Sequence, residues 1–251
     1  TAITTGDRNI AIGFEAGKAI STGGENVAIG YQALATEDGH GLNIAIGSEA
    51  LENLNAGADA YNVAVGHNAG KNVTTGSTNT LIGARAGDAL TVGSENVAIG
   101  DLALSADTQG SRNVAIGRAA LDAQNFTSAT NSNNTAIGYD AGSSVTVGVN
   151  NVLIGAHAGD ALTDADFNVA MGFQALTNDT LGSGSTAIGH HALQTQNFSS
   201  ATTTYNTAVG YQAGKATTTG VRNILVGGLT GDAITGGQRN VAMGHGALST
   251  D

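Results

Sequence analysis

One five-residue motif recurs along the whole chain and constrains its fold more than any other feature. It reads Asn, then Val, Ile or Thr, then Ala or Leu, then Ile, Val or Met, then Gly. Fourteen copies occur, ten of the intervals between them are 17 residues, one is 19 and two are 21. A fixed short period over a whole chain is typical of a solenoid, in which each repeat contacts only its neighbours. The copies begin at Asn9, Asn26, Asn43, Asn62, Asn79, Asn96, Asn113, Asn134, Asn151, Asn168, Ser185, Asn206, Asn223 and Asn240.

Each repeat is too short for two helices, and its glycine and β-branched residues disfavour helix. We therefore predict an all-β fold, a parallel β-solenoid (β-roll) of about fourteen coils. One coil adds about 4.8 Å to the axis, so the stack is expected to be ~67 Å long. We treat residues 1–251 as a single repeat domain, and as a piece of a longer chain because the sequence begins inside the repeat.

A longer period of four coils is superimposed on the short one. Residues 62–133 and 134–205 form two blocks of 72, and 206–251 begin a third. Both complete blocks end in a four-residue insertion that carries the sequence Gln-Asn-Phe, at 124–126 and at 196–198. The sequence thus predicts a bulge on the solenoid every four coils, roughly 19 Å apart.

Aligned columns of the coils suggest distinct roles when the motif Asn is counted as offset zero. Offsets one and three are apolar or β-branched, and we expect them to point into the coil. The glycine at offset four indicates a corner with positive φ, and the alanine at offset seven a second cramped position. The asparagine column suits a corner at which side-chain amides bond to one another along the stack. Its members include Asn26, Asn96, Asn113, Asn134, Asn151 and Asn168.

The residues at offsets eight and eleven compensate each other in size: most coils have a large apolar side chain at one of the two positions and not at both. Where offset eight is Gly, offset eleven is apolar in every coil but one, as in the pair Gly87 and Leu90. Where offset eight is Leu, offset eleven is mostly polar, as in the pair Leu104 and Asp107. Because protein interiors are close-packed, we infer that one interior volume is filled from either of two chain positions.

The composition excludes several classes of function. Charged residues make up 12% of the chain and the formal net charge is −11, which opposes binding to nucleic acid or insertion at an anionic membrane. No apolar run approaches the ~18 residues of a membrane span, and the absence of cysteine excludes disulfides. No nucleophile, phosphate-binding or zinc motif occurs, so we expect no enzyme activity, no cofactor and no metal. Asp88, Asp160 and Asp232 recur in similar segments, where a corner or capping role is expected.

A column of threonines at offset twelve is the first candidate surface. If these side chains point outward, their small groups form a flat face that could order ice-like water or pack against a second chain. The alternative is that threonine simply stacks well in a β-ladder. The candidates are Thr74, Thr91, Thr146, Thr163, Thr218 and Thr235.

The two insertions are the second candidate surface. Phe126 and Phe198, with the neighbouring Gln124 and Gln196, could contact a receptor or a glycan, since exposed aromatic residues on protruding loops often do. The alternative is that each Phe folds back to close its loop or meets a sister subunit.

These motifs resemble two known groups of repeats over essentially the whole chain. NVAIG at 26–30, 96–100 and 113–117 and NTAIG at 134–138 are similar to the head repeats of trimeric autotransporter adhesins. NTAVGYQAG at 206–214 is similar to NTAIGYQAL-type repeats of phage tail fibres and giant surface proteins. The resemblance implies a left-handed parallel β-roll, three chains side by side, and a role in reaching and attaching to surfaces.

We accordingly expect a structural or adhesive segment of an extracellular or virion fibre. Its partners are expected to be further copies, as a homotrimer or fibre-forming assembly, with a host surface or glycan as ligand. One alternative is an ice-binding β-solenoid that uses the threonine column. Another is a glycan-processing tail spike, which the lack of a paired-carboxylate motif disfavours.

Overall fold

The computed structural model describes residues 5–249, and its contacts divide the chain into two compact units. Unit 1 comprises Thr1–Asn131 and unit 2 Ser132–Asp251. The division lies two residues from the boundary between the predicted blocks 62–133 and 134–205. The ends of the predicted domain, 1–4 and 250–251, lie outside the described residues.

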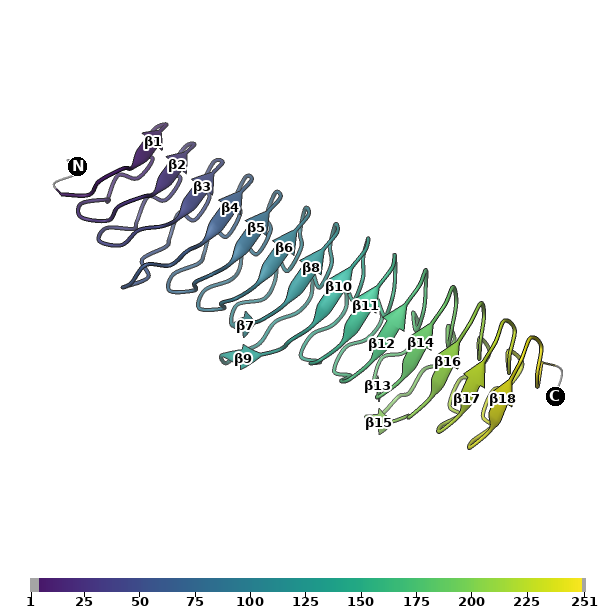
Figure 1. Ribbon diagram of the computed structural model, residues 1–251. Helices are drawn as coiled ribbons and strands as arrows, with labels where there is room; N and C mark the ends of the chain where they lie inside the picture. Colours follow the sequence, from purple (N-terminus) through teal and green to yellow (C-terminus); the bar gives the residue numbers. More distant parts are fainter. Residues whose placement is uncertain (1–4, 250–251) are drawn as a thin grey trace. The chain divides into compact units, whose positions relative to one another are not determined.

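Both units are built from two- and three-residue strands and turns, and no helix occurs between residues 5 and 249 (Figure 1). Unit 1 contains β1 (Ile10–Ile12), β2 (Val27–Ile29), β3 (Ile44–Ile46), β4 (Val63–Val65), β5 (Thr80–Ile82), β6 (Val97–Ile99), β7 (Gly110–Ser111), β8 (Val114–Ile116) and β9 (Thr130–Asn131). Unit 2 contains β10 (Thr135–Ile137), β11 (Val152–Ile154), β12 (Val169–Met171), β13 (Gly182–Ser183), β14 (Thr186–Ile188), β15 (Thr202–Thr203), β16 (Thr207–Val209), β17 (Ile224–Val226) and β18 (Val241–Met243).

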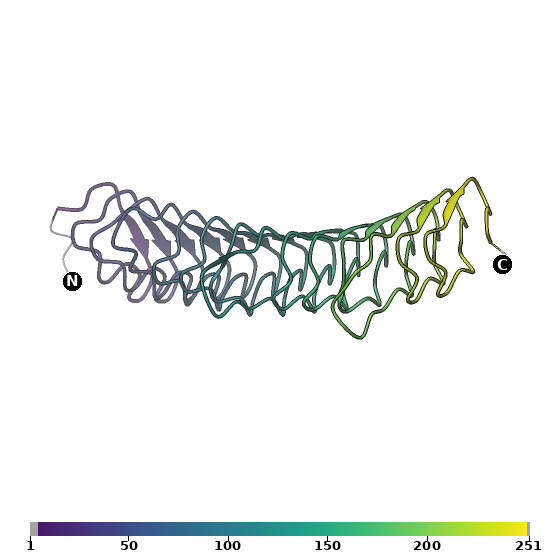
Figure 2. The same cartoon turned by 90° about the horizontal axis from the view of Figure 1, so that it is seen from below.

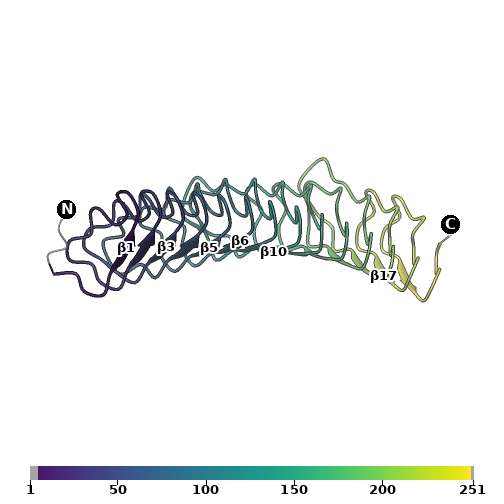
Figure 3. The same ribbon diagram turned by 90° about the horizontal axis from the view of Figure 1, so that it is seen from above.

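Within each unit the motif strands pair in parallel with the strand of the next coil. The register joins equivalent motif positions, so that Val97, Ala98 and Ile99 pair with Val114, Ala115 and Ile116. Two small additional sheets pair β7 with β9 in unit 1 and β13 with β15 in unit 2. The prediction of a parallel β-solenoid with about fourteen coils is therefore confirmed, and Figures 2 and 3 show the coils from opposite sides.

The middle residue of each motif strand faces the interior. Ala28, Ala98 and Leu153 are fully buried, whereas the residues on either side of them are partly exposed. The prediction that offsets one and three point into the coil is therefore wrong. Because side chains alternate between the two faces of a strand, the offset-two column, mostly Ala with Leu in three coils, fills the interior, and the columns at offsets one and three lie on the outer face.

The motif glycines form the corner that follows each strand. Their φ values lie between 117° and 144°, a region that residues with a Cβ atom rarely adopt. A Cβ atom on Gly100 would also lie 2.5 Å from the backbone oxygen of Gly117 in the next coil. Two independent constraints, conformation and close approach, thus require glycine in this column.

Each coil also places residues other than glycine at positive φ. Offset six does so in most coils, with Gln32 at 52° and Gln174 at 52°, and so does the residue before the motif, with Glu95 at 60°. The left-handed conformation costs roughly 1 kcal/mol or more per residue. The cost is offset because these residues hydrogen-bond to the preceding coil, as when Gln32 N donates to Phe14 O at 2.9 Å.

The packing of offsets eight and eleven confirms the predicted compensation. A Cβ atom on Gly87 would lie 2.9 Å from a methyl carbon of Leu90, because that side chain occupies the space above the glycine. In the next coil Leu104 is fully buried and takes the same place, and offset eleven becomes Asp107.

Replacing Gly100 by Ala should destabilise unit 1 by about 3 kcal/mol or more, since both the conformation and the contact with Gly117 are violated. Gly57→Ala is the matched control. Gly57 also has a positive φ of 71°, but its Cβ atom would meet no atom within 4 Å, so we expect a loss of only about 1 kcal/mol. Chemical denaturation of the two variants measures the difference, and equal losses would contradict the close-approach argument.

Candidate functional site

Buried asparagines form a ladder that is continuous in unit 1 and is interrupted in unit 2 by Ser185, which stands at the motif position there. In unit 1, Asn96 accepts a hydrogen bond from Asn113 N at 2.9 Å with its Oδ1 atom and donates through Nδ2 to Gly110 O at 3.0 Å. In unit 2, Asn151 is placed in the same way between Asn168 N and Ala165 O. Except for the partly exposed Asn9 and Asn240, these asparagine side chains are buried, so this column holds coils together and offers no binding surface. The six predicted ladder members, Asn26, Asn96, Asn113, Asn134, Asn151 and Asn168, all lie buried in it.

Threonines of the offset-twelve column are partly or fully exposed, but their hydroxyl groups are engaged in the stack. Thr91 Oγ1 donates to Thr108 O at 2.9 Å, and Thr163 Oγ1 to Thr180 O at 3.1 Å. Thr74, Thr146 and Thr218 bond to the next coil in the same way, while Thr235 is exposed. These bonds favour the β-ladder interpretation of the column over a surface that orders water.

The insertions do not present their aromatic residues. Phe126 is 6% and Phe198 is 7% exposed, and Gln124 and Gln196 are fully buried. The expectation that these four side chains form a contact surface is thus corrected: each Phe folds back and closes its loop. The insertion of unit 2, coloured green in Figures 2 and 3, still protrudes beyond the neighbouring coils, but through its backbone and small polar residues.

A buried carboxylate anchors each insertion. In unit 2, Asp179 accepts from Gly182 N at 3.0 Å and Phe198 N at 3.2 Å through Oδ1, and from Gln196 Nε2 at 2.5 Å through Oδ2. Gln196 in turn bonds to Ser185 Oγ at 2.8 Å. In unit 1, Asp107 holds Gly110 N, Phe126 N and Gln124 Nε2 in the same arrangement. The polar residues of offset eleven therefore position the bulges.

Burial raises the pKa of Asp179 above its ordinary value, although the hydrogen bonds from Gln196, Phe198 and Gly182 oppose the shift. The folded state therefore binds a proton more tightly than the unfolded state does. By linkage, the Asp179 contribution to stability increases as the pH falls from neutral towards the ordinary value of about 3.8.

A third buried carboxylate, Glu37, belongs to a group of possible metal ligands. The ligand atoms of Glu37, Asp38 and His40 lie within 4.8 Å of one another, the one such group found among residues 5–249. Glu37 Oε1 accepts from His40 N at 3.1 Å and lies 3.4 Å from His40 Nδ1. Glu37 thus holds the amide three residues later, as Asp107 does, and its Oε2 atom accepts from Ala56 N of the next coil at 3.3 Å.

Rings from consecutive coils line one edge of unit 2. Phe173 stacks on His190 with centroids 5.4 Å apart, and His190 stacks on Tyr211 at 5.3 Å. His157 meets Phe173 edge to face, and its Nδ1 atom lies 3.2 Å from Asp160 Oδ2. Burial and the neighbouring His190 lower the pKa of His191, which favours the neutral imidazole.

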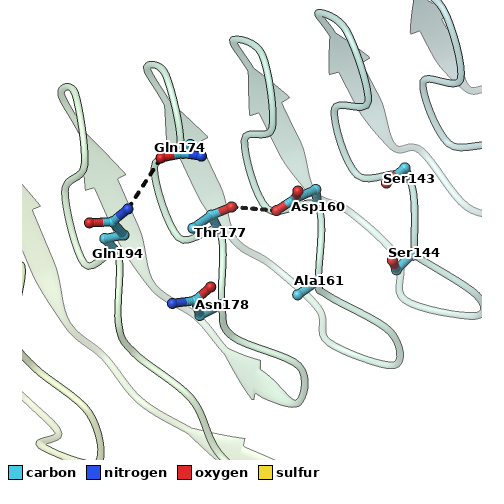
Figure 4. Close-up of a pocket in the computed structure, with 8 residues that line it drawn as sticks. All are labelled: Ser143, Ser144, Asp160, Ala161, Gln174, Thr177, Asn178 and Gln194. Atoms are coloured by element: carbon cyan, nitrogen blue, oxygen red, sulfur yellow. Dashed lines mark hydrogen bonds between the residues drawn. The ribbon is translucent and has the colours of Figure 1, made fainter.

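A polar groove of about 420 Å³ lies on unit 2 and includes Asp160, the partner of His157 (Figure 4). Asp160 accepts from Thr177 Oγ1 at 2.5 Å, and Gln194 Nε2 donates to Gln174 Oε1 at 3.2 Å. The groove is lined by hydroxyl, amide and carboxylate groups without a lysine or arginine. Asp160 was expected at a corner, and the sequence gives no sign of the groove, because the residues that line it belong to four different coils.

The outer face of the motif sheet carries exposed apolar side chains on each unit. It consists of offsets one and three, which alternate with the buried column. Members that are well exposed in unit 1 are Ile10, Ile12, Ile44, Ile46 and Ile82, and in unit 2 Met171, Ile224, Val241 and Met243. Monomeric soluble proteins rarely expose large contiguous apolar patches, which makes this face a candidate interaction surface.

Comparisons with known proteins give no assignment: no protein-family model, no curated protein and no solved structure matches this chain. In residues 5–249 we find no helix that has the length and apolar character needed to cross a membrane.

Asp179→Asn should lower the free energy of unfolding of unit 2 by about 2 kcal/mol at pH 7. The new NH₂ group would face the NH₂ group of Gln196, so the buried Gln196 Nε2 would lose its hydrogen-bond acceptor. Lowering the pH towards 4 should increase the difference in stability between the wild type and the variant, since only the wild type is stabilised by protonation of Asp179. Thermal unfolding at several pH values measures both effects. A stability difference that decreases at acidic pH would contradict the raised pKa of Asp179.

Proposed function

We propose that this chain is a structural and adhesive segment of an extracellular or virion fibre. In this proposal, copies of the chain associate through the apolar outer face of the motif sheet, and the other faces carry the contacts with a target surface. Localisation outside the cell, at the cell surface or on a virion follows from the resemblance of the repeats to adhesin heads and tail fibres.

The observation that carries the proposal is the two-column apolar face. Every motif strand contributes an apolar side chain at offset three, and ten of the fourteen contribute Val or Ile at offset one, where the other four have Thr. Neighbouring strands pair in register, so the offset-three side chains form an unbroken apolar row along each unit, beside an offset-one row that is apolar except at its threonines. Leaving such rows in water is unfavourable by roughly 25 cal/mol per Å² of apolar area, which favours covering them.

A second copy of the same chain is the occupant that fits this face best. The rows repeat once per coil, at about 4.8 Å, so the matching surface needs the same spacing along its whole length. Another coil stack has that spacing, whereas a compact globular partner does not. The low charge of the chain, 12% of residues, also reduces the repulsion between copies. Three copies are expected from the resemblance to trimeric adhesins.

Light scattering of the purified protein in dilute solution tests the proposal. A mass of three times 24.7 kDa supports a trimer, and any closed multiple supports self-association. A monomer at all concentrations would contradict the proposed assembly.

Substitutions on the sheet face distinguish it from other surfaces. We expect Ile82→Lys combined with Met171→Lys to shift the protein towards the monomer, because each places a charge in the covered rows. Val92→Lys combined with Val147→Lys is the matched control, since these valines are similarly exposed, at 38% and 42% against 37% for both sheet residues, but lie off the sheet. Equal dissociation in both variants would show that the sheet face is not the interface.

A further inference from the structure

Beside the insertion of unit 2 lies a cleft of about 430 Å³ that the repeat pattern does not account for. Phe167 and Tyr205 line it, and they are 62% and 60% exposed. They occupy the same column of the solenoid two coils apart, and Gly184 occupies that column between them. The floor and ends carry Asp166, Ser183 of β13 and Thr203 of β15.

Comparison of the two 72-residue blocks shows what opens the cleft. Phe167 and Gly184 of unit 2 correspond to Glu95 and Arg112 of unit 1. In unit 1 these two side chains form an ion pair, with Arg112 Nε 3.1 Å from Glu95 Oε2, which spans the same place. The glycine therefore leaves an unfilled position between two aromatic residues.

The backbone around the cleft is the same in both blocks. Asp166 N donates to Ser183 Oγ at 3.0 Å, just as Ser94 N donates to Ser111 Oγ at 3.0 Å in unit 1. Gly184 has φ 76° where Arg112 has φ 64°, and a Cβ atom at Gly184 would meet nothing closer than 3.7 Å. The fold thus does not require glycine at this position, and the open space needs another explanation.

The polar groups of the cleft are suited to hydroxyl-bearing ligands. Asp166 uses Oδ1 to accept from Val149 N at 2.7 Å, which fixes the carboxylate and leaves Oδ2 as a further acceptor. Ser183 Oγ accepts from Asp166 N and keeps its own proton to donate. No lysine or arginine lines the cleft, so it offers nothing to neutralise an anionic ligand.

From this arrangement we infer that the cleft between Phe167 and Tyr205 binds a neutral saccharide unit. A sugar ring presents an apolar face to an aromatic side chain and hydroxyl groups to a mixed donor and acceptor floor, and the cleft supplies both. This inference rests on the proposed adhesive function and names the chemistry of its target. It places the binding position beside the protruding insertion of unit 2, where a glycan on another surface can reach it.

Saturation-transfer NMR with four neutral disaccharides, lactose, maltose, cellobiose and diacetylchitobiose, tests the inference on the intact protein. We expect saturable binding of at least one of them. The double variant Phe167→Glu, Gly184→Arg installs the ion pair of unit 1 and should weaken that binding about tenfold or more. Phe14→Ala is the control, because it removes an aromatic side chain that is 66% exposed in unit 1, and it should leave the affinity unchanged.

The outcomes separate this inference from the proposed assembly. If none of the four disaccharides binds while the protein keeps its oligomeric mass, the saccharide inference is wrong and the assembly stands. Binding of tetramethylammonium without binding of a sugar overturns it as well, since the aromatic pair and Asp166 would then recognise a cation. Undiminished sugar binding by the double variant would place the site elsewhere. If the protein is a monomer but still binds sugar, the proposed assembly is wrong and the saccharide inference stands.

Discussion

Hydrogen bonding between successive coils is the interaction on which the rest of the structure depends. A coil packs mainly against the coils before and after it, so most backbone groups that are not paired within a turn find their partners there. The buried asparagines extend this ladder into the corner of each coil, where Asn96 joins Asn113 N to Gly110 O. Without these amides, a turn would be buried with unpaired groups at each coil, at a cost of about 1–3 kcal/mol for each group.

This dependence explains the residues that look unfavourable in isolation. Leu104 at φ 55° and Glu95 at φ 60° adopt a conformation that asparagine or glycine tolerates better. In the stack they direct their amides towards a neighbouring coil, as Leu104 N does to Ala120 O at 3.0 Å. Buried Asp107 and Asp179 follow the same logic, since each gathers two backbone amides and a glutamine where an insertion interrupts the regular coil. Local strain and buried charge are therefore tolerated where they preserve the ladder.

Much of the fold could be predicted from the sequence because identical columns recur, but the direction of the side chains could not. Spacing identified the coils, the glycine corners and the exchange of volume between Gly87, Leu90 and Leu104. The strand sequence Val-Ala-Ile alternates with period two, and this period does not say which face is inside. We expected the β-branched columns inside, yet Ala98 and its equivalents at offset two, including Leu153, face the interior on that wall.

The candidate sites were less predictable, because they arise from differences between repeats rather than from the repeat itself. Gln124 and Gln196 were expected on the surface because polar residues usually are, and the carboxylate partners that bury them come from the preceding coil. The cleft at Gly184 has a signal in the sequence, namely the loss of the pair formed by Glu95 and Arg112 between one block and the next. A comparison of the 72-residue blocks position by position would have found it.

Hydrogen exchange of the backbone amides, followed by mass spectrometry, tests the central role of the inter-coil ladder most directly. The amides of Asn79, Asn96 and Asn113 each donate to the side chain of the preceding asparagine at 2.9–3.0 Å, although they lie outside the strands. We predict that they exchange as slowly as the amides of the motif strands, at least about 10³-fold slower than unprotected amides. Exchange as fast as that of the exposed insertion residues 127–129 would contradict the account.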